Sequence, residues 1–266
     1  MSSTDRRLDR LEAMLGDARL EVERVGDMLN CARGSGKLGA KANVDPIPFL
    51  ESLTDHDDAA AHRRMAGYVS GVKHVLLEPS DSDADQWDFP TAAGKLTMGL
   101  EVDSFVDGCA DASGNPAWVQ PLDGDIVYAF FFELDMGIRV LDEAQFERWT
   151  ATKDRVVAGA RSMLFHKAQT TDPVPLEDHP EVEELRVGDG YDAARCLVLD
   201  DLMFGEFDDS TRIAIPTPDD LLFVRDGTGG GVEALRAALR ERYDEADYPL
   251  SDALFRFERG KPVRTD

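Results

Sequence analysis

The segment Gly188-Asp-Gly-Tyr-Asp192, followed by Arg195, is the candidate ligand-binding site of this sequence. Glycines let a ligand approach the backbone closely, and a guanidinium group binds a carboxylate or phosphate through two parallel hydrogen bonds. Asp189, Asp192 and Arg195 would supply the charges. The same residues also suit a turn in which Arg195 pairs with Asp189 or Asp192 inside the fold, and this is the simpler interpretation. The sequence assigns no catalytic residue.

Aspartates at alternate positions, Asp81, Asp83 and Asp85, begin a stretch that resembles a calcium-binding loop. Such a loop needs glycine at its sixth position for a sharp turn and glutamate at its twelfth to bind the ion with two oxygens. Here these positions hold Gln86 and Ala92. We therefore expect a solvated acidic loop and no calcium site.

A histidine among aspartates, His56, is a second candidate metal ligand, with His62 six residues later. Two ligands on one helix face lie three or four residues apart, so this spacing does not bring the two rings together. Asp57 and Asp58 suit the start of a helix, where the macrodipole favours negative charge. We expect neither a metal site nor a cofactor.

Phosphate-loop and nucleophile patterns are both incomplete. The run GSGK at 34–37 ends like a phosphate-binding loop, but Cys31 replaces the first glycine and Leu38 replaces the final Ser or Thr. We predict a flexible linker over 34–44 instead. Cys109 and Cys196 have no histidine near them in the sequence, and no GxSxG motif is present.

Charge excludes one class of partner. The chain has 53 acidic and 29 basic residues and a net charge of −24, with Asp prominent among the acids and Lys scarce among the bases. Neutralising phosphates requires clustered Lys and Arg, so we expect no nucleic acid and no membrane surface as partner. An Asp-rich surface stays hydrated at multimolar salt, which predicts a halophilic source; an ordinary acidic cytosolic protein is the alternative.

The sequence also predicts the compartment. The 3 cysteines are widely separated, which indicates no disulfide framework and a reducing interior. The N-terminal segment has no apolar signal-peptide core, and no stretch approaches 18 uncharged apolar residues. We expect a soluble cytoplasmic protein.

An apolar stripe with spacings of three and four predicts one amphipathic helix over 1–33, with a seam like that of a coiled coil. Such a seam packs either on a second chain or on the protein's own body, and the sequence leaves both open. We expect it to mediate self-association, or binding to another protein, through Leu8, Leu11, Leu15, Val22, Val25 and Leu29.

Beyond the linker, residues 45–266 are predicted to form one α+β domain, with a helical part over 45–78 and a sheet-rich part over 96–266. The most apolar run, 125–135, is rich in aromatic and branched residues and predicts a central strand, paired with 137–142 as a hairpin. Strand pairs interrupted by helices indicate a largely antiparallel sheet with flanking helices.

Sequence blocks in the second half resemble a known family. The blocks are IVYAFFFELDMGIRVLDEAQFERW, GDGYDAARCLVLDDL, RIAIPTPDDLLFV and ALRERYDEADYPLSDALFRFERGK. In order and spacing, residues 123–261 resemble domain-of-unknown-function family 1444, whose bacterial members are called YtpQ-like. The resemblance implies an α+β fold. It implies no activity and no catalytic residue, because that family is uncharacterised.

Together these features favour a non-catalytic cytoplasmic protein that binds another protein or itself through the N-terminal helix. The alternative is a small hydrolase, or a ligand or cation sensor, with a site near Asp189, Asp192 and Arg195.

The charge surplus generates the first prediction. Carboxylates that repel one another at low ionic strength are screened by salt, so stable folding should require molar potassium chloride. The thermal unfolding midpoint, followed by circular dichroism, should rise steeply from dilute buffer to several molar salt. An unchanged midpoint would refute the halophilic interpretation.

Overall fold

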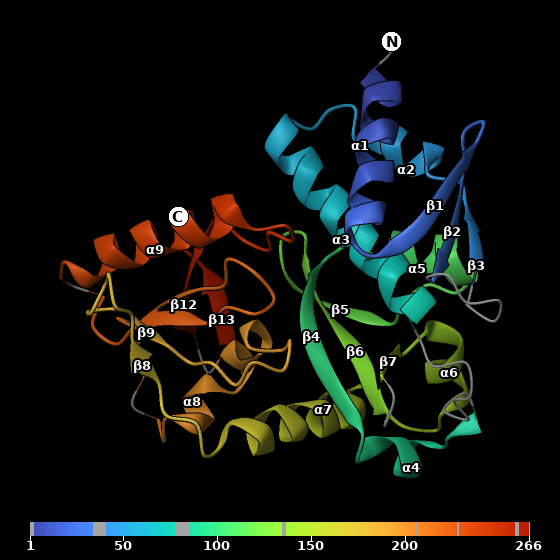
Figure 1. The fold of residues 1–266 in the computed structure, drawn as a ribbon. Coiled ribbons are helices and arrows are strands. Elements are labelled where there is room, and N and C mark those ends of the chain that lie inside the picture. The colour runs from blue at the N-terminus through green and yellow to red at the C-terminus, as the bar shows by residue number, and fades with distance from the viewer. Residues whose placement is uncertain are drawn as a thin grey trace. The chain divides into compact units, whose positions relative to one another are not determined.

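The computed structural model describes residues 3–33, 41–77, 86–134, 137–205, 207–227, 229–258 and 261–265 (Figure 1). The GSGK run and the three aspartates of the calcium-like loop lie outside these residues. Internal contacts divide the chain into two compact units. Unit 1 comprises Met1–Asp88, Val102–Val119 and Phe131–Thr150; unit 2 comprises Phe89–Glu101, Gln120–Phe130 and Ala151–Asp266. The single domain predicted over 45–266 is thus divided between both units.

Unit 1 combines helices with a small antiparallel sheet of order β1-β2-β3. Its elements are α1 (Ser3–Asp17), β1 (Leu20–Val25), β2 (Met28–Arg33), β3 (Lys41–Val44), α2 (Ile47–Ser52), α3 (Asp58–Leu77), α5 (Ser104–Ser113), β7 (Gly137–Val140) and α6 (Glu143–Arg148). Asp57 caps α3 as expected, since its carboxylate accepts a hydrogen bond from the Ala60 amide at 2.8 Å.

The helix predicted over 1–33 is wrong beyond Asp17. Arg19 adopts a left-handed φ of 66° and its amide donates to the Gly16 carbonyl at 3.0 Å, which ends α1. The chain then forms the β1–β2 hairpin, whose turn contains Gly26 at a φ of 66°. Branched residues in β1 and a glycine in the turn favour this hairpin over a continued helix.

The apolar stripe is therefore divided between a helix and a hairpin. Leu8, Leu11 and Leu15 on α1 are buried within unit 1, and Leu29 on β2 is buried with them. Val22 on β1 is half-buried and paired with Cys31, whereas Val25 is 57% exposed. The apolar face of α1 thus packs on the protein's own body.

The linker predicted over 34–44 is also wrong in its last four residues. Residues 41–44 form β3, which pairs with β2 in a register that matches Leu29 to Val44 and Ala32 to Lys41. Ala42 and Val44 are buried and alternate with exposed neighbours, as expected of a strand with one face on a core.

Helices α3 and α5 pack at very short range because glycines lie where they meet. A Cβ atom at Gly71 would collide with the Phe105 carbonyl oxygen, and one at Gly108 would collide with the Tyr68 carbonyl oxygen. The Tyr68 hydroxyl also donates to Asp111 on α5 at 2.5 Å. This contact joins two stretches of unit 1 that are far apart in the sequence.

Unit 2 is built around a sheet of order β13-β12-β10-β11-β9-β8, whose recorded pairs are antiparallel. Helix α9 packs on this sheet through Leu235, Ala238 and Leu239. The elements are α4 (Phe89–Ala93), α7 (Lys153–Ala168), β8 (Val174–Pro175), β9 (Glu183–Glu184), the 3-10 helix η2 (Ala193–Leu197), α8 (Leu199–Leu202), β10 (Arg212–Ala214), β11 (Leu222–Val224), α9 (Gly231–Glu245), β12 (Leu254–Glu258) and β13 (Lys261–Arg264).

A third sheet takes strands from the ranges of both units. Its order is β4-β6-β5, with β4 (Leu96–Val102), β5 (Val119–Asp123) and β6 (Ile126–Leu134), and β7 pairs antiparallel with β6. The β6–β7 pair is the hairpin that the apolar run predicts. The α+β class with antiparallel sheets and flanking helices is confirmed. Within the described residues, no helix has the length and apolar character needed to cross a bilayer.

The glycine contact generates the second prediction. Gly71→Ala should destabilise the protein by about 1–3 kcal/mol, because the α3 and α5 backbones must separate to admit a methyl group. Gly159→Ala in α7 is the matched control, since nothing lies within 4 Å of its Cβ position. The control should stabilise by about 0.5–1 kcal/mol through the better helix propensity of alanine. Urea unfolding at fixed salt measures both, and equal midpoints would contradict the close approach.

Candidate functional site

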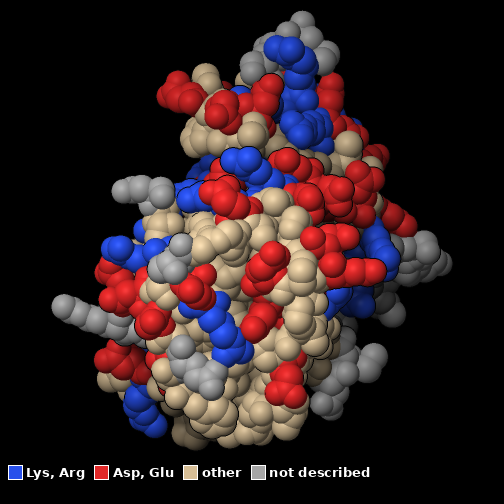
Figure 2. All heavy atoms as spheres, turned by 90° about the vertical axis from the view of Figure 1, so that its left-hand side faces the viewer, with Lys and Arg blue, Asp and Glu red and all other residues tan. Residues whose placement is uncertain are grey.

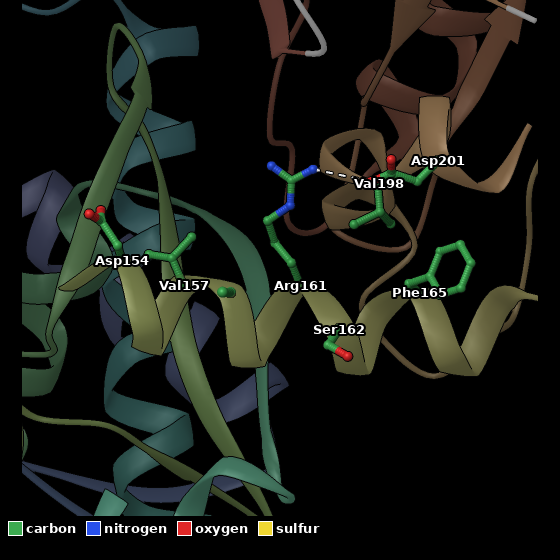
Figure 3. Close-up of a pocket in the computed structure, with 8 residues that line it drawn as sticks. Asp154, Val157, Arg161, Ser162, Phe165, Val198 and Asp201 are labelled. Carbon is green, nitrogen blue, oxygen red and sulfur yellow. Dashed lines mark hydrogen bonds and ion pairs between the residues drawn. The ribbon is translucent and has the colours of Figure 1, made fainter. Parts of the chain in front are cut away.

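A pocket of about 720 Å³ lies in unit 2 between α7 and the segment that joins η2 to α8. The lining side chains of α7 recur at spacings of three and four, which places them along one face of the helix. Asp154, Val157, Arg161 and Phe165 extend to the side of α7 on which Val198 and Asp201 lie (Figure 3). The lining residues are Asp154, Val157, Ala158, Arg161, Ser162, Phe165, Val198 and Asp201.

One ion pair crosses this pocket. The Arg161 guanidinium donates to the Asp201 carboxylate at 3.4 Å, and the two side chains are 36% and 65% exposed (Figure 3). Such a solvated pair contributes only about 0–1 kcal/mol. Both groups can therefore exchange this contact for one with a ligand at little cost.

The apolar part of the lining lies beside these charges. Val157, Phe165 and Val198 supply branched and aromatic surface, while Asp154 and Arg161 stand on the same helix. A concave surface with a few charged groups among apolar ones is the usual composition of a small-molecule site. The pocket can bury an apolar group and orient a charged one.

The residues proposed from the sequence come together next to this pocket, in a buried network. Arg195 binds Asp189 with two parallel hydrogen bonds of 2.8 Å and Asp192 with a third of 2.8 Å. Asp192 also accepts the amides of Val187 and Gly188 at 2.9 Å. The side chains of Arg195 and Asp192 have no exposed surface, and that of Asp189 is 23% exposed.

This geometry corresponds to the internal pairing that the sequence allows. Burial raises the pKa of Asp189, but hydrogen bonding and charge from Arg195, with Lys167 as a further cation, outweigh it and hold the pKa below its usual value. The Lys167 ammonium lies 3.5 Å from Asp189 and over the Tyr191 ring. The network thus ties the turn at 187–192 and η2 to the end of α7.

The three cysteines are buried. Burial raises the pKa of the Cys196 thiol to about 12, although Arg161 opposes the shift, and burial raises that of Cys31 to about 11. Cys109 is buried as well. Thiolates are the reactive form of cysteine, so neither shifted group suits nucleophilic chemistry. Among the described residues, no group of three or more His, Cys, Asp or Glu could hold a metal ion.

None of the pocket residues was identified as a candidate from the sequence. Arg161 and Phe165 stand four residues apart on α7. That spacing is the one available signal, because four residues bring two side chains together on a helix. Val198 and Asp201 join them only through the fold.

No protein-family model, no curated protein and no solved structure matches this chain. The resemblance of residues 123–261 to family 1444 therefore stays a prediction.

The contrast between the two Arg–Asp contacts generates the third prediction. Arg195→Met should cost about 3–5 kcal/mol, because it leaves Asp192 charged and buried without its partner. Arg161→Met removes a solvated pair by the same substitution and should cost at most about 1 kcal/mol. Urea unfolding curves of both variants measure the difference, and similar costs would show that the buried network does not brace unit 2.

Proposed function

We propose that the protein acts by binding rather than by catalysis, and that the α7 pocket in unit 2 is its ligand site. The observation that carries this proposal is the lining, in which Phe165 and Val198 share one concavity of about 720 Å³ with Arg161 and Asp154. Sites for small molecules have volumes of about 300–1,000 Å³ and the same mixture of apolar and charged groups.

The chemistry of the lining supports binding over covalent catalysis. Nucleophilic catalysis needs a hydroxyl or thiol beside a base that takes its proton. Among the described lining residues, Ser162 carries the one hydroxyl, and none is a His or Cys. The thiol nearest in the chain, that of Cys196, is buried with a raised pKa.

The pocket takes the place of both binding sites expected from the sequence. The apolar face of α1 is buried inside unit 1 through Leu8, Leu11 and Leu15. We therefore do not assign the partner site to α1. The Arg195 guanidinium already donates hydrogen bonds to Asp189 and Asp192. We therefore assign this network a positioning role and place ligand recognition on α7.

We further infer that the protein works in a reducing, salt-rich cytoplasm and does not bind nucleic acid. The three cysteines are free and buried, which suits a compartment without disulfide formation. Acidic side chains are spread over the face in Figure 2, with basic ones among them. The net charge of −24 repels polyanions.

The fourth prediction tests the pocket with an uncharged probe. We expect 4-phenylbutanol, added to the full chain, to shift the amide NMR signals of residues 154–165 and 198–201 saturably, because its ring fits the apolar lining. Ala158→Trp should abolish these shifts by filling the pocket. His166→Trp, on an exposed position of the same helix, should leave them intact. Shifts confined to other residues, or none, would refute the proposed site.

A further inference from the structure

The pocket lining contains more negative than positive side chains. Asp154 and Asp201 supply two carboxylates and Arg161 supplies the one guanidinium among the described lining residues. Arg161 already pairs with Asp201 at 3.4 Å. Within the described part of the chain, Asp154 takes part in no ion pair and accepts no side-chain hydrogen bond. The pocket thus offers one uncompensated negative charge.

The position of Asp154 has a structural explanation that does not oppose this role. It stands in the first turn of α7, where the helix dipole favours a carboxylate. A dipole stabilises the charge without occupying the carboxylate oxygens, so these remain free to accept hydrogen bonds. Figure 3 shows the side chain extending to the same side of α7 as Val157 and Arg161.

The apolar lining sets the shape of a ligand that would use this charge. Val157 is one turn from Asp154, and Phe165 is three turns away, about 16 Å along the helix axis. A cation at Asp154 can therefore carry an apolar body that extends along α7 past Val157 toward Val198 (Figure 3). The field of a chain with net charge −24 draws cations and repels anions.

We propose that the ligand of the α7 pocket is an organic cation, an amine or guanidine with an elongated apolar body, whose charge binds Asp154. This inference rests on the proposed function of the pocket. A free amine and the basic side chain of a peptide present the same chemistry, and both are covered by the proposal.

The fifth prediction compares three probes of the same length on the full chain: 4-phenylbutylammonium, 4-phenylbutanol and 4-phenylbutyrate. Titrations are followed by amide NMR at the lowest potassium chloride concentration at which the chain is folded. We expect the ammonium to bind about two- to fivefold more tightly than the alcohol, as one solvated ion pair allows, and the carboxylate to bind most weakly. Additional salt should reduce the advantage.

Asp154→Asn should remove the preference for the ammonium and leave the alcohol unchanged. Asp172→Asn, an exposed carboxylate outside the lining, is the matched control and should change neither affinity. Acetyl-Phe-Lys-amide, which carries the charge on a peptide side chain, distinguishes the two sources of the cation by whether it binds more or less tightly than the free ammonium.

The outcomes separate the two proposals. If the carboxylate binds at least as tightly as the ammonium, or if Asp154→Asn leaves the preference intact, the cation inference fails while the pocket stands. If the alcohol also fails to shift residues 154–165, the proposed function itself fails.

Discussion

The hydrogen-bonded network of Arg195 with Asp189 and Asp192 is the constraint on which the pocket depends. A guanidinium without exposed surface loses its hydration, at a cost of several kcal/mol for each ion. The three carboxylate contacts of 2.8 Å and the backbone amides that hold Asp192 offset this cost only when all are in place. The turn at 187–192 and η2 must therefore form together, and η2 leads directly into Val198 and α8, the wall that faces α7.

Unit 1 depends instead on a close approach of two helix backbones. Gly71 and Gly108 let two helix backbones touch, and any larger residue would need the space that a carbonyl group occupies. Tyr68 then reaches Asp111, and burial, with the hydrogen bond to Asp111 as a further cause, raises its pKa well above the usual value. This contact depends on the shape of the backbone, whereas the network in unit 2 depends on electrostatics.

The parts that could be predicted are those governed by local pattern. The apolar run of β6, its hairpin with β7 and the cap at Asp57 follow from side-chain type and spacing. The helix predicted over 1–33 is wrong beyond Asp17 because Val22, Val25 and Leu29 continue the apolar spacing of α1 by coincidence. Gly26 and the branched residues favour a hairpin there. The pocket could not be predicted, since Arg161 and Asp201 are 40 residues apart in the sequence and only the fold brings them together.

The Arg195 network and the Arg161–Asp201 pair have the same chemistry and opposite consequences because their burial differs. Water is excluded around Arg195, so losing an aspartate partner would leave a buried charge without compensation. The hydrogen bonds of this network therefore do not exchange. Around Arg161, water replaces any partner that leaves, so the pair with Asp201 opens at little cost. A binding site needs both properties in one unit: a wall held by contacts that cannot exchange, and lining charges that can. The α7 pocket has this combination, with Asp154 as the lining charge that is available before any exchange occurs.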